Sequence, residues 1–571
     1  DFIVDVGPRA GRKGGHIMAA GTIDDILRSD SITADYLTGR RRIGIPETLR
    51  KGTGQCIVIR GARGNNLKNV TAEFPLGKFI CVTGVSGSGK STLVNETLRP
   101  ILSKELYRSF GQPLEYDSVE GIGHIDKLVV VDQSPIGRTP RSNPATYSNV
   151  FSDIRKLFEM TPDAQIRGFK AGRFSFNVKG GRCEECRGAG VQTIEMNFLP
   201  DVYVRCKACG GHRYNRETLE VKYKGKNIDD VLNMTVNMAV EFFENIPAIH
   251  QKLRAIQEVG LGYLTLGQPC TTLSGGESQR IKLSSELSKR DTGRTLYILD
   301  EPSIGLHPRD TNRLIGVLKQ LRDLGNTVIV VEHEEEVIRA ADWIVDIGPK
   351  AGYNGGEVVF SGTLPQLLKS KKSLTADYLT GRREIAVPAT ARGWSNSITV
   401  KGARENNLRN VDVRIPLGVM TCITGVSGSG KSSLAKGILY PALRRLLYDT
   451  GVKPGDFDGL TGDVQLLKSV EMVDQNPIGK SSRSNPVTYI KAYDEIRKLF
   501  SDQPYAQHNG LGASAFSFNI AGGRCEECQG EGMIKVSMQF MADVELVCEA
   551  CGGRRFRDEV LEVKYRGKSI Y

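Results

Sequence analysis

Two glycine-rich segments of the chain have the composition of phosphate-binding loops. Residues 84–91 read GVSGSGKS, and the same eight residues return at positions 425–432. Backbone N–H groups beside the glycines can surround phosphates, the lysine can pair with the β- and γ-phosphates, and the following serine can bind Mg²⁺. A strand-like run precedes the first loop and a helix-like run follows it, which favours this interpretation over a ligand-free glycine turn. The residues expected to hold ATP and Mg²⁺ are Gly84, Gly87, Ser88, Gly89, Lys90, Ser91 and Thr92 in the first loop and Gly425, Gly428, Ser429, Gly430, Lys431, Ser432 and Ser433 in the second.

Further polar residues are placed to complete an ATP-hydrolysing site. An apolar, strand-like run ends in Asp300 and Glu301. Asp300 is expected to hold Mg²⁺ through water, and Glu301 to orient and polarise the attacking water. His333 follows another strand-like run downstream, a position that favours a catalytic role over the structural role of most single histidines. Gln133 follows a third strand-like run, at a position that resembles that of the Q-loop glutamine in ABC ATPases, and Gln475 is its counterpart. The resemblance implies that these glutamines contact the nucleotide site.

Residues 273–280, LSGGESQR, resemble the signature segment of ABC ATPases. In such proteins Ser274, Gly275 and Gly276 would cap a γ-phosphate that is held by the P-loop of another domain. The order of P-loop, glutamine, signature, acidic pair and histidine matches that class. The resemblance implies an α/β fold: an ABC-type P-loop nucleotide-binding domain with a helical signature subdomain and composite ATP sites.

Eight of the twelve cysteines form two groups with the spacing C-x2-C-x19-C-x2-C. This spacing is typical of structural zinc sites in which four thiolates close the coordination sphere. Disulfides are the disfavoured alternative, because the isolated cysteines elsewhere indicate a reducing compartment, the cytoplasm. Each module is inserted after a P-loop, and residues 191–204, within the first, are expected to form a hairpin. The expected zinc ligands are Cys183, Cys186, Cys206, Cys209, Cys525, Cys528, Cys548 and Cys551.

The chain repeats itself at an offset of 341 to 342 residues, as TADYLTGRR at 33–41 and 375–383 shows. A period of this length indicates a duplicated domain. Residues 1–46 are expected to be the C-terminal tail of an upstream nucleotide-binding domain. Residues 47–390 form a complete domain with a zinc module at about 183–209. Residues 391–571 form a partial second copy with a P-loop and a zinc module at about 525–551, so the sequence reads as a fragment.

The overall composition favours an acidic partner. The formal net charge is +12 at pH 7 over 571 residues, which suits binding to nucleic acid. The sequence contains no apolar run of about 18 residues and no signal peptide, so neither a membrane span nor a membrane partner is expected.

An ABC signature combined with an inserted four-cysteine module resembles the UvrA family, the damage-recognition ATPases of bacterial nucleotide excision repair. Supporting segments are RSNPATY at 141–147, RFSFNV at 173–178 and DTGRTLYILDEP at 291–302. The resemblance implies binding to damaged double-stranded DNA, loading of a UvrB-like helicase subunit, and a homodimer. The UvrB-binding insertion of the family is absent from these residues. The two second-domain-like copies leave open a natural tandem variant or an artificially joined sequence.

Two other functions compete with this interpretation. An ABC transporter subunit would share the ATPase residues but would not need the zinc insertion or the basic segment. A protein-binding module is suggested by CEECRGAG at 183–190, which resembles the zinc modules of DnaJ-type chaperones. The complete ATPase set makes a protein-binding role insufficient for the whole chain.

The DNA contacts are expected in the basic segment between Gln133 and the first zinc module. Lysine and arginine suit phosphates, which position DNA without reading its sequence. The alternative is a solvated basic surface over core aromatic residues. The preferred DNA-binding residues are Arg138, Arg141, Lys170 and Arg173.

The composite nature of ABC sites predicts unequal roles for the two P-loops. The loop of Lys431 would face the signature at Ser274 and would bind ATP with little hydrolysis, because the second copy lacks its own glutamate and histidine. The loop of Lys90 would need a signature from another chain or from further sequence. Glu301 is therefore expected to be essential for turnover, and Lys431 dispensable.

Overall fold

The computed structural model describes residues 1–44, 50–109, 111–137, 139–194, 202–289, 292–388, 390–449, 452–474, 483–536 and 544–571. Two of the predicted site residues, Arg138 and Gln475, lie outside the described residues. The chain divides into two compact units, Asp1–Val470 and Glu471–Tyr571. None of the described helices combines the length and the apolar composition needed to cross a bilayer.

A six-stranded sheet lies at the centre of the complete domain, in the order β13-β12-β5-β11-β10-β7. Five strands are parallel, and the edge strand β13 is antiparallel to β12. Parallel strands covered on both faces require nearly continuous apolar runs, as FICVT and TVIVV in β5 and β11 provide. The strands are β5 (Phe79–Thr83), β7 (Lys127–Val131), β10 (Thr295–Asp300), β11 (Thr327–Val331), β12 (Trp343–Gly348) and β13 (Glu357–Gly362).

The two faces of this sheet bury different residues of the same strands. In β5, Phe79 and Cys81 belong to one buried cluster, while Ile80 and Val82 belong to another. This follows from the two-residue period of a strand, which sends neighbouring side chains to opposite faces. The first cluster packs under the helices of the signature region. The second packs under an antiparallel sheet, β4-β3-β6, and under the helix that follows the P-loop.

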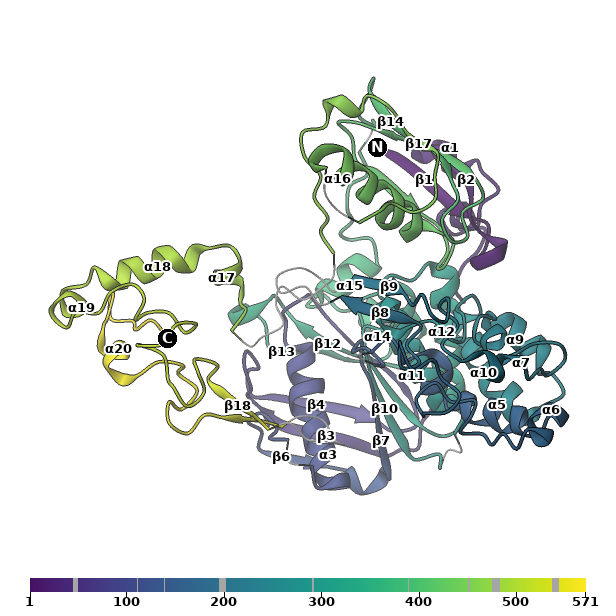
Figure 1. The fold of residues 1–571 in the computed structure, drawn as a ribbon. Coiled ribbons are helices and arrows are strands. Elements are labelled where there is room, and N and C mark those ends of the chain that lie inside the picture. The colour runs from purple at the N-terminus through teal and green to yellow at the C-terminus, as the bar shows by residue number, and fades with distance from the viewer. Residues whose placement is uncertain are drawn as a thin grey trace. The chain divides into compact units, whose positions relative to one another are not determined.

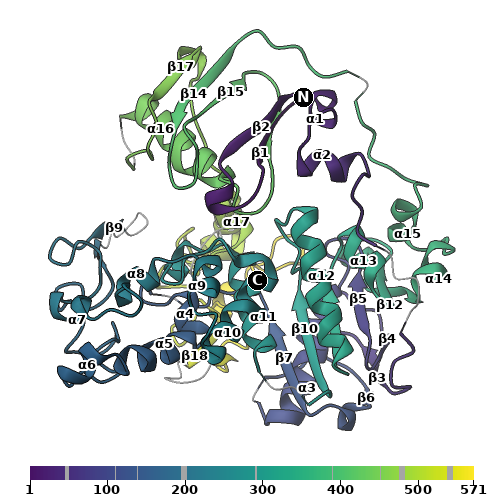
Figure 2. The same ribbon diagram turned by 90° about the vertical axis from the view of Figure 1, so that its right-hand side faces the viewer.

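Figures 1 and 2 show these two sets of elements on different sides of the domain. The first set has mostly short helices: α4 (Pro144–Tyr147), α5 (Val150–Glu159), α6 (Pro162–Ile166), α7 (Arg216–Glu220), α8 (Ile228–Leu232), α9 (Val236–Phe242), α10 (Pro247–Ile256) and α11 (Gly275–Leu287). The second set is β3 (Cys56–Ala62), β4 (Val70–Pro75), β6 (Ser118–Glu120), the π-type turn η2 (Thr92–Leu98) and α3 (Arg99–Tyr107). The remaining helices are α12 (Pro308–Asp323), α13 (Glu335–Ala340), α14 (Leu364–Leu368) and α15 (Leu374–Leu379).

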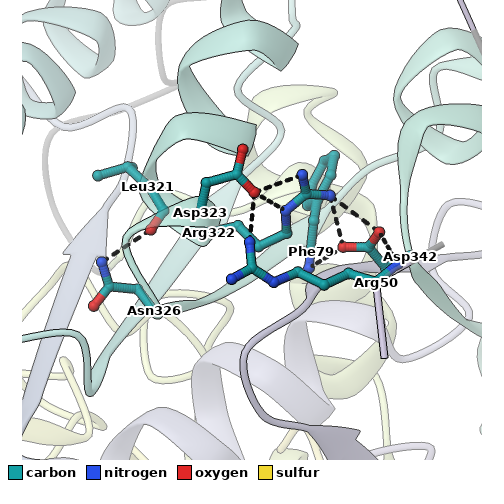
Figure 3. Close-up of polar contacts among 7 residues, drawn as sticks. All are labelled: Arg50, Phe79, Leu321, Arg322, Asp323, Asn326 and Asp342. Atoms are coloured by element: carbon teal, nitrogen blue, oxygen red, sulfur yellow. Dashed lines mark hydrogen bonds and ion pairs between the residues drawn. The ribbon is translucent and has the colours of Figure 1, made fainter. Parts of the chain in front are cut away.

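The buried carboxylate of Asp342 connects β5, α12 and β12 through hydrogen bonds and an ion pair (Figure 3). Asp342, 1% exposed, accepts from the backbone N–H of Phe79 at 2.9 Å and from that of Arg50 at 3.4 Å. Arg322, near the end of α12, donates to both of its oxygens at 2.9 and 3.0 Å. Asp342 thus ties the start of β5 to α12 and to the strand that it precedes, β12.

We expect Asp342→Ala to lower the free energy of unfolding by about 3–5 kcal/mol, because it leaves the mostly buried guanidinium of Arg322 without its main partner. Asp323→Ala is the matched control: Asp323 also binds Arg322, but its side chain is 54% exposed. Its loss should cost at most about 1 kcal/mol. Denaturant unfolding of both variants measures the difference, and equal losses would contradict the role given to Asp342.

The amino-terminal segment, residues 1–44, completes a second sheet with residues far along the chain. Strand β1 (Phe2–Gly7) lies parallel to β16 (Thr421–Thr424), with Phe2 opposite Thr421 and Asp5 opposite Thr424. The pairing of β12 with β5 has the same register at an offset of 341 residues: Phe2 corresponds to Trp343 and Thr421 to Ile80, and Trp343 lies opposite Ile80. Asp1 likewise accepts from the backbone N–H of Arg392 and Met420, as Asp342 does from Arg50 and Phe79.

We call residues 1–44 and 390–470 together the second P-loop lobe. They share one buried cluster, in which Phe2, Val4 and Val6 pack against Val400, Leu434 and Ile438. Its elements gather together in both views (Figures 1 and 2). They are β1, β2 (His16–Gly21), α1 (Ile23–Leu27), α2 (Ile32–Leu37), β14 (Ser397–Ala403), β15 (Val411–Pro416), β16, η7 (Ser433–Leu439), α16 (Tyr440–Tyr448) and β17 (Gly459–Gly462).

The second unit holds the second four-cysteine module and a small aromatic core. Phe500, Phe516, Phe518 and Phe556 are buried in this core. The elements are α17 (Pro486–Tyr489), α18 (Ala492–Ser501), α19 (Pro504–His508), the hairpin β18 (Met533–Val536) and β19 (Val544–Val547), and α20 (Asp558–Glu562).

Candidate nucleotide-binding and zinc sites

The first P-loop connects β5 to η2, as its sequence predicts. Lys90 is 7% exposed, and its Nζ donates to the carbonyl oxygens of Gly84 and Val85, both at 2.9 Å. Burial lowers the pKa of Lys90, and the nearby Glu301, Asp346 and Asp300 carboxylates partly offset this effect. A buried lysine in a glycine-rich loop at the start of a helix is suited to bind a polyphosphate.

The predicted acidic pair lies at the end of β10, in the same unit and close enough to Lys90 to affect its pKa. Asp300 accepts from Asn95 Nδ2 at 2.9 Å, and burial, followed by repulsion from Glu301, raises the pKa of Asp300. A carboxylate in this position gains from a divalent cation, so it fits the Mg²⁺ role. Glu301 has a left-handed backbone (φ 43°), and its Oε1 lies 3.8 Å from Nδ1 of His333.

The structure also places Gln133 beside Glu301. Its Nε2 donates to the carbonyl oxygen of Glu301 at 3.5 Å, a long hydrogen bond. Gln279, on the signature helix α11, was not singled out by the sequence analysis. It is 1% exposed, and its Nε2 donates to the carbonyl oxygens of Val131 and Asp300 at 3.1 and 2.8 Å. Gln279 therefore couples the signature helix to the ends of β7 and β10.

Two buried carboxylates beside the site were also missed by the sequence analysis. Glu332 is fully buried and accepts from the backbone N–H of Ser303 at 2.8 Å and of His333 at 3.0 Å, so it links the loop after β10 to the histidine. Asp346 is 2% exposed and interacts electrostatically with Lys90. No local motif marks either residue: Asp346 is one acid within an apolar strand, and Glu332 is one of four glutamates in the segment EHEEE at 332–336. The role of each depends on tertiary neighbours.

The signature segment forms the first turn of α11. Ser274 is the N-cap: its Oγ accepts from the backbone N–H of Glu277, whose carboxylate binds back to Ser274 N in a capping box. The hydroxyl of Tyr263 donates to the carboxylate of Glu277. Gly275 and Gly276 follow the cap and leave backbone N–H groups of the helix start available to an anion.

The second P-loop has the same internal geometry as the first. Lys431 Nζ donates to the carbonyl oxygens of Gly425 and Val426 at 2.6 and 2.9 Å, and burial lowers its pKa. The amino-terminal segment supports this loop, because Gly11 N and Gly15 N donate to the carbonyl oxygens of Gly428 and Ser429. Residues Gly352 and Gly356 make the corresponding bonds to Gly87 and Ser88 in the first loop.

The second P-loop also contacts the complete domain. Ser427 N donates to Oδ2 of Asp310, at the start of α12, at 3.1 Å. Gly428 lies so close to Tyr263 that a Cβ on the glycine would come within 2.9 Å of the ring. Since Tyr263 binds Glu277 of the signature helix, one side chain separates this P-loop from the signature.

The eight predicted cysteines form two clusters, and in each the four sulfur atoms lie within 4.8 Å of one another. The distances Cys186–Cys209 and Cys528–Cys551 are both 3.7 Å between Sγ atoms. Four thiolates at about 2.3 Å around a tetrahedral Zn²⁺ would be separated by about 3.8 Å, so both sets fit zinc. The predicted hairpin is present as β8 (Val191–Ile194) paired with β9 (Val202–Arg205).

The candidate DNA-binding residues are exposed to different degrees. Lys170 has an 85% exposed side chain and lies 3.6 Å from Glu159. Arg141 is half-buried in the turn before α4. Arg173 already has partners within the protein: its guanidinium binds Glu217 at 2.5 Å and lies 4.4 Å from the ring centroid of Phe169. Four aromatic residues of the same basic segment are buried in the core and cannot stack on bases: Phe151, Phe158, Phe174 and Phe176.

Known proteins share this architecture. The UvrABC system protein A of Clostridium perfringens is 59% identical over 380 residues, which cover 66% of this chain and 40% of that protein. Its counterpart from Bacillus subtilis is 57% identical over 380 residues, with the same coverage. The crystal structure of UvrA2 from Deinococcus radiodurans has a TM-score of 0.63 and 50% identity, covering 67% of this chain and 46% of that one.

No family model matches the chain. The chain spans about two fifths of the length of the curated relatives that it matches. The similarity is found in both sequence and fold. It confirms the predicted ABC-type P-loop α/β fold, and the two four-cysteine groups are suited to zinc. By this similarity the chain belongs to the UvrA family.

Proposed function

We propose that this chain is a DNA-binding ATPase that recognises damaged double-stranded DNA in nucleotide excision repair. The observation that carries the proposal is the four-cysteine module inserted between P-loop and signature of a domain that is 57–59% identical to UvrABC system protein A. A transporter subunit would not require this insertion. A UvrB-like helicase subunit and a second copy of the chain are the proposed protein partners.

ATP hydrolysis is assigned to the first P-loop. Lys90 and the loop N–H groups would hold the phosphates, and Asp300, with Ser91 and Thr92, would hold Mg²⁺, which would supply positive charge to the phosphoryl oxygens. Glu301 orients and polarises the attacking water as general base. His333, 3.8 Å from Glu301, and Gln133, bonded to its carbonyl, fix the position of that carboxylate and sense the γ-phosphate end of the site.

The second P-loop is proposed to bind ATP with little hydrolysis. Lys431, Ser432 and the surrounding glycines repeat the phosphate-binding elements of the first loop. The described second P-loop lobe contains no counterpart of Glu301 or His333. The carboxylates near Lys431 are Asp5, which accepts from Thr33, and Asp310, which accepts from Ser427 N. Its nucleotide would be capped by the signature at Ser274, Gly275 and Gly276.

The zinc modules are proposed to be structural. Closed sets of four thiolates leave zinc no open position for a substrate. Each ion would hold the base of a hairpin, β8–β9 or β18–β19. Near the first module, His212 binds Asp229 of α8 at 2.7 Å, and Arg213 donates to Gly267 O at 2.8 Å. These bonds connect the module to the helices that lead to the signature.

DNA binding is proposed to use the exposed basic residues between Gln133 and the zinc module. Lys170 and Arg141 are the better candidates, because the partners of Arg173 compete with a phosphate for its guanidinium. Contacts of this kind would be independent of sequence, and lesions would be sensed through the altered deformability of the duplex.

We expect Lys170→Ala to weaken binding to a 30-base-pair duplex and to reduce the slope of log affinity against log salt by about 0.9, the share of one phosphate contact. Lys371→Ala, an exposed lysine outside the basic segment, is the control and should leave the slope unchanged. Fluorescence anisotropy over a range of salt concentrations measures both. Identical slopes for Lys170→Ala and the unmodified chain would remove Lys170 from the proposed surface.

A further inference from the structure

A buried arginine connects the first zinc module to the segment that leads to the signature. Arg213 is 9% exposed, and its Nη2 donates to the carbonyl oxygen of Gly267 at 2.8 Å. Its guanidinium lies 5.5 Å from the ring centroid of Phe176, which is also buried. Gly267 belongs to the connection between α10 and α11, and Ser274, at the end of that connection, is the N-cap of the signature helix.

The same arginine packs against the first cysteine cluster. A Cβ on Gly190 would lie 3.0 Å from Cγ and 3.5 Å from Nε of Arg213. The N–H of Gly190 donates to Cys186 Sγ at 3.3 Å, and its carbonyl oxygen accepts from Cys206 N at 3.0 Å. The carbonyl oxygen of Arg213 accepts from Cys183 N at 2.9 Å. The side chain of Arg213 and the sulfur of Cys186 therefore have one glycine as a common neighbour.

The guanidinium of Arg213 is buried without a counter-ion of its own. Among the described residues it forms no ion pair with a carboxylate, and its Nη1 has no hydrogen-bond partner. Asp229 interacts with it electrostatically, but this carboxylate is already bound by His212 at 2.7 Å. Cys186 and Cys209 also interact with it electrostatically. A buried cation without a counter-ion is costly, and Zn²⁺ held by four thiolates would have the net negative charge that compensates it.

The second module repeats the contact between an arginine and the cysteine cluster. Arg555 lies 5.6 Å from the ring centroid of Phe518, and a Cβ on Gly532 would lie 3.2 Å from Cγ of Arg555. The N–H of Gly532 donates to Cys528 Sγ at 3.2 Å. Arg213 and Arg555 also share a left-handed backbone, with φ of 66° and 70°. An arginine beside the sulfur atoms is thus part of the module itself.

We propose that Arg213 is a positioning residue that links zinc occupancy of the first module to the residues before the signature. Its charge compensates the zinc–thiolate cluster, and its Nη2 holds Gly267. Residues 265–273 are therefore held in place only while the four thiolates are ionised around the metal, and a displacement of the module that carries β8 and β9 reaches the signature through Arg213. The inference rests on the proposed zinc sites and does not depend on whether the chain hydrolyses ATP.

Zinc affinity of the full chain tests the role of the charge. In a Cys548→Ser background, where only the first module is expected to hold zinc, Arg213→Met should weaken zinc binding by about 10–100-fold, the usual effect of losing a residue that supports metal ligands. Arg213→Lys keeps the positive charge and should bind zinc more tightly than Arg213→Met. Arg555→Met makes the same substitution in the other module and should leave this affinity unchanged. Competition with a chelator measures all four proteins.

Hydrogen exchange at residues 265–273 tests the link to the signature. In the Cys548→Ser chain without further substitution, chelation should speed exchange there, and added zinc should reverse the change. In Arg213→Met, exchange should be fast even with saturating zinc, and chelation should add little. A residue that only fills space would leave the response of residues 265–273 to zinc as it is.

Weaker zinc binding in Arg213→Met than in Arg213→Lys, together with loss of the zinc response at residues 265–273, supports the inference. Four results would overturn it: unchanged affinity in Arg213→Met, equal weakening in both variants, the same zinc response in Arg213→Met as in the chain without it, or no zinc response in that chain. Absence of zinc from the unmodified protein would instead contradict the proposed zinc sites.

Discussion

Replacing Glu301 by glutamine is expected to reduce ATP turnover by about 10²–10⁴-fold, whereas replacing Lys431 by alanine should leave most of it. Glutamine preserves the size of the side chain but cannot accept a proton from water. Glu301 adjoins the Mg²⁺ candidate Asp300, and its carboxylate lies 3.8 Å from His333. The described lobe around Lys431 offers no carboxylate equivalent to Glu301. Loss of the Lys431 side chain therefore affects ATP binding at a site that contributes little hydrolysis.

Lys90→Ala is the matched control for Lys431→Ala. Both lysines bind two carbonyl oxygens of their own loops, so the two substitutions remove the same interactions at different sites. Steady-state phosphate release should fall to background in Lys90→Ala and Glu301→Gln and persist in Lys431→Ala. If Lys431→Ala stops turnover as completely as Glu301→Gln, the assignment of hydrolysis to the first P-loop is wrong.

Replacing Cys206 by serine is expected to remove one of two zinc ions and to unfold the first module. Its thiol is fully buried among the other three sulfur atoms, and a structural zinc site contributes about 10–16 kcal/mol of apparent binding free energy. Metal analysis should fall from two ions per chain to one. Hydrogen exchange should become fast at residues 183–194 and 202–214 but stay slow in the central strands, which have a separate core.

Two controls separate zinc loss from general damage by a serine. Cys548→Ser should remove the other ion and leave the first module protected. Cys270→Ser changes a buried cysteine outside both clusters, where burial raises the pKa of the thiol to about 12 and keeps it protonated. That variant should retain two ions. Full retention of zinc by Cys206→Ser would contradict the four-thiolate site.

Local sequence predicted much of the nucleotide site. The loop of Lys90 begins after an apolar run, and that run is β5, whose sequence is typical of a strand buried on both faces. The cysteine spacing placed four sulfur atoms within 4.8 Å of one another. In both cases the chemistry depends on residues close together in sequence, so a short motif contains the information.

Long-range relations were not predicted. The pairing of Phe2 with Thr421 joins strands that no local pattern connects, and it becomes intelligible only through the equivalent contact of β12 with β5. Gln279 and Glu332 act through backbone atoms of distant strands. Phe151 and Phe176 lie in the basic segment of the sequence, yet both are buried in the core. Phe151 is on the apolar face of the amphipathic helix α5.

Recognition of damaged DNA by this chain can be measured as lesion discrimination by the zinc-loaded protein. Binding should be measured with ATP on one duplex with and without a bulky lesion, across a range of salt concentrations. We expect tighter binding to the damaged duplex, with a salt dependence typical of phosphate contacts. Equal affinity for the two duplexes would contradict damage recognition by this chain, and absence of binding to either duplex at low salt would contradict DNA binding itself.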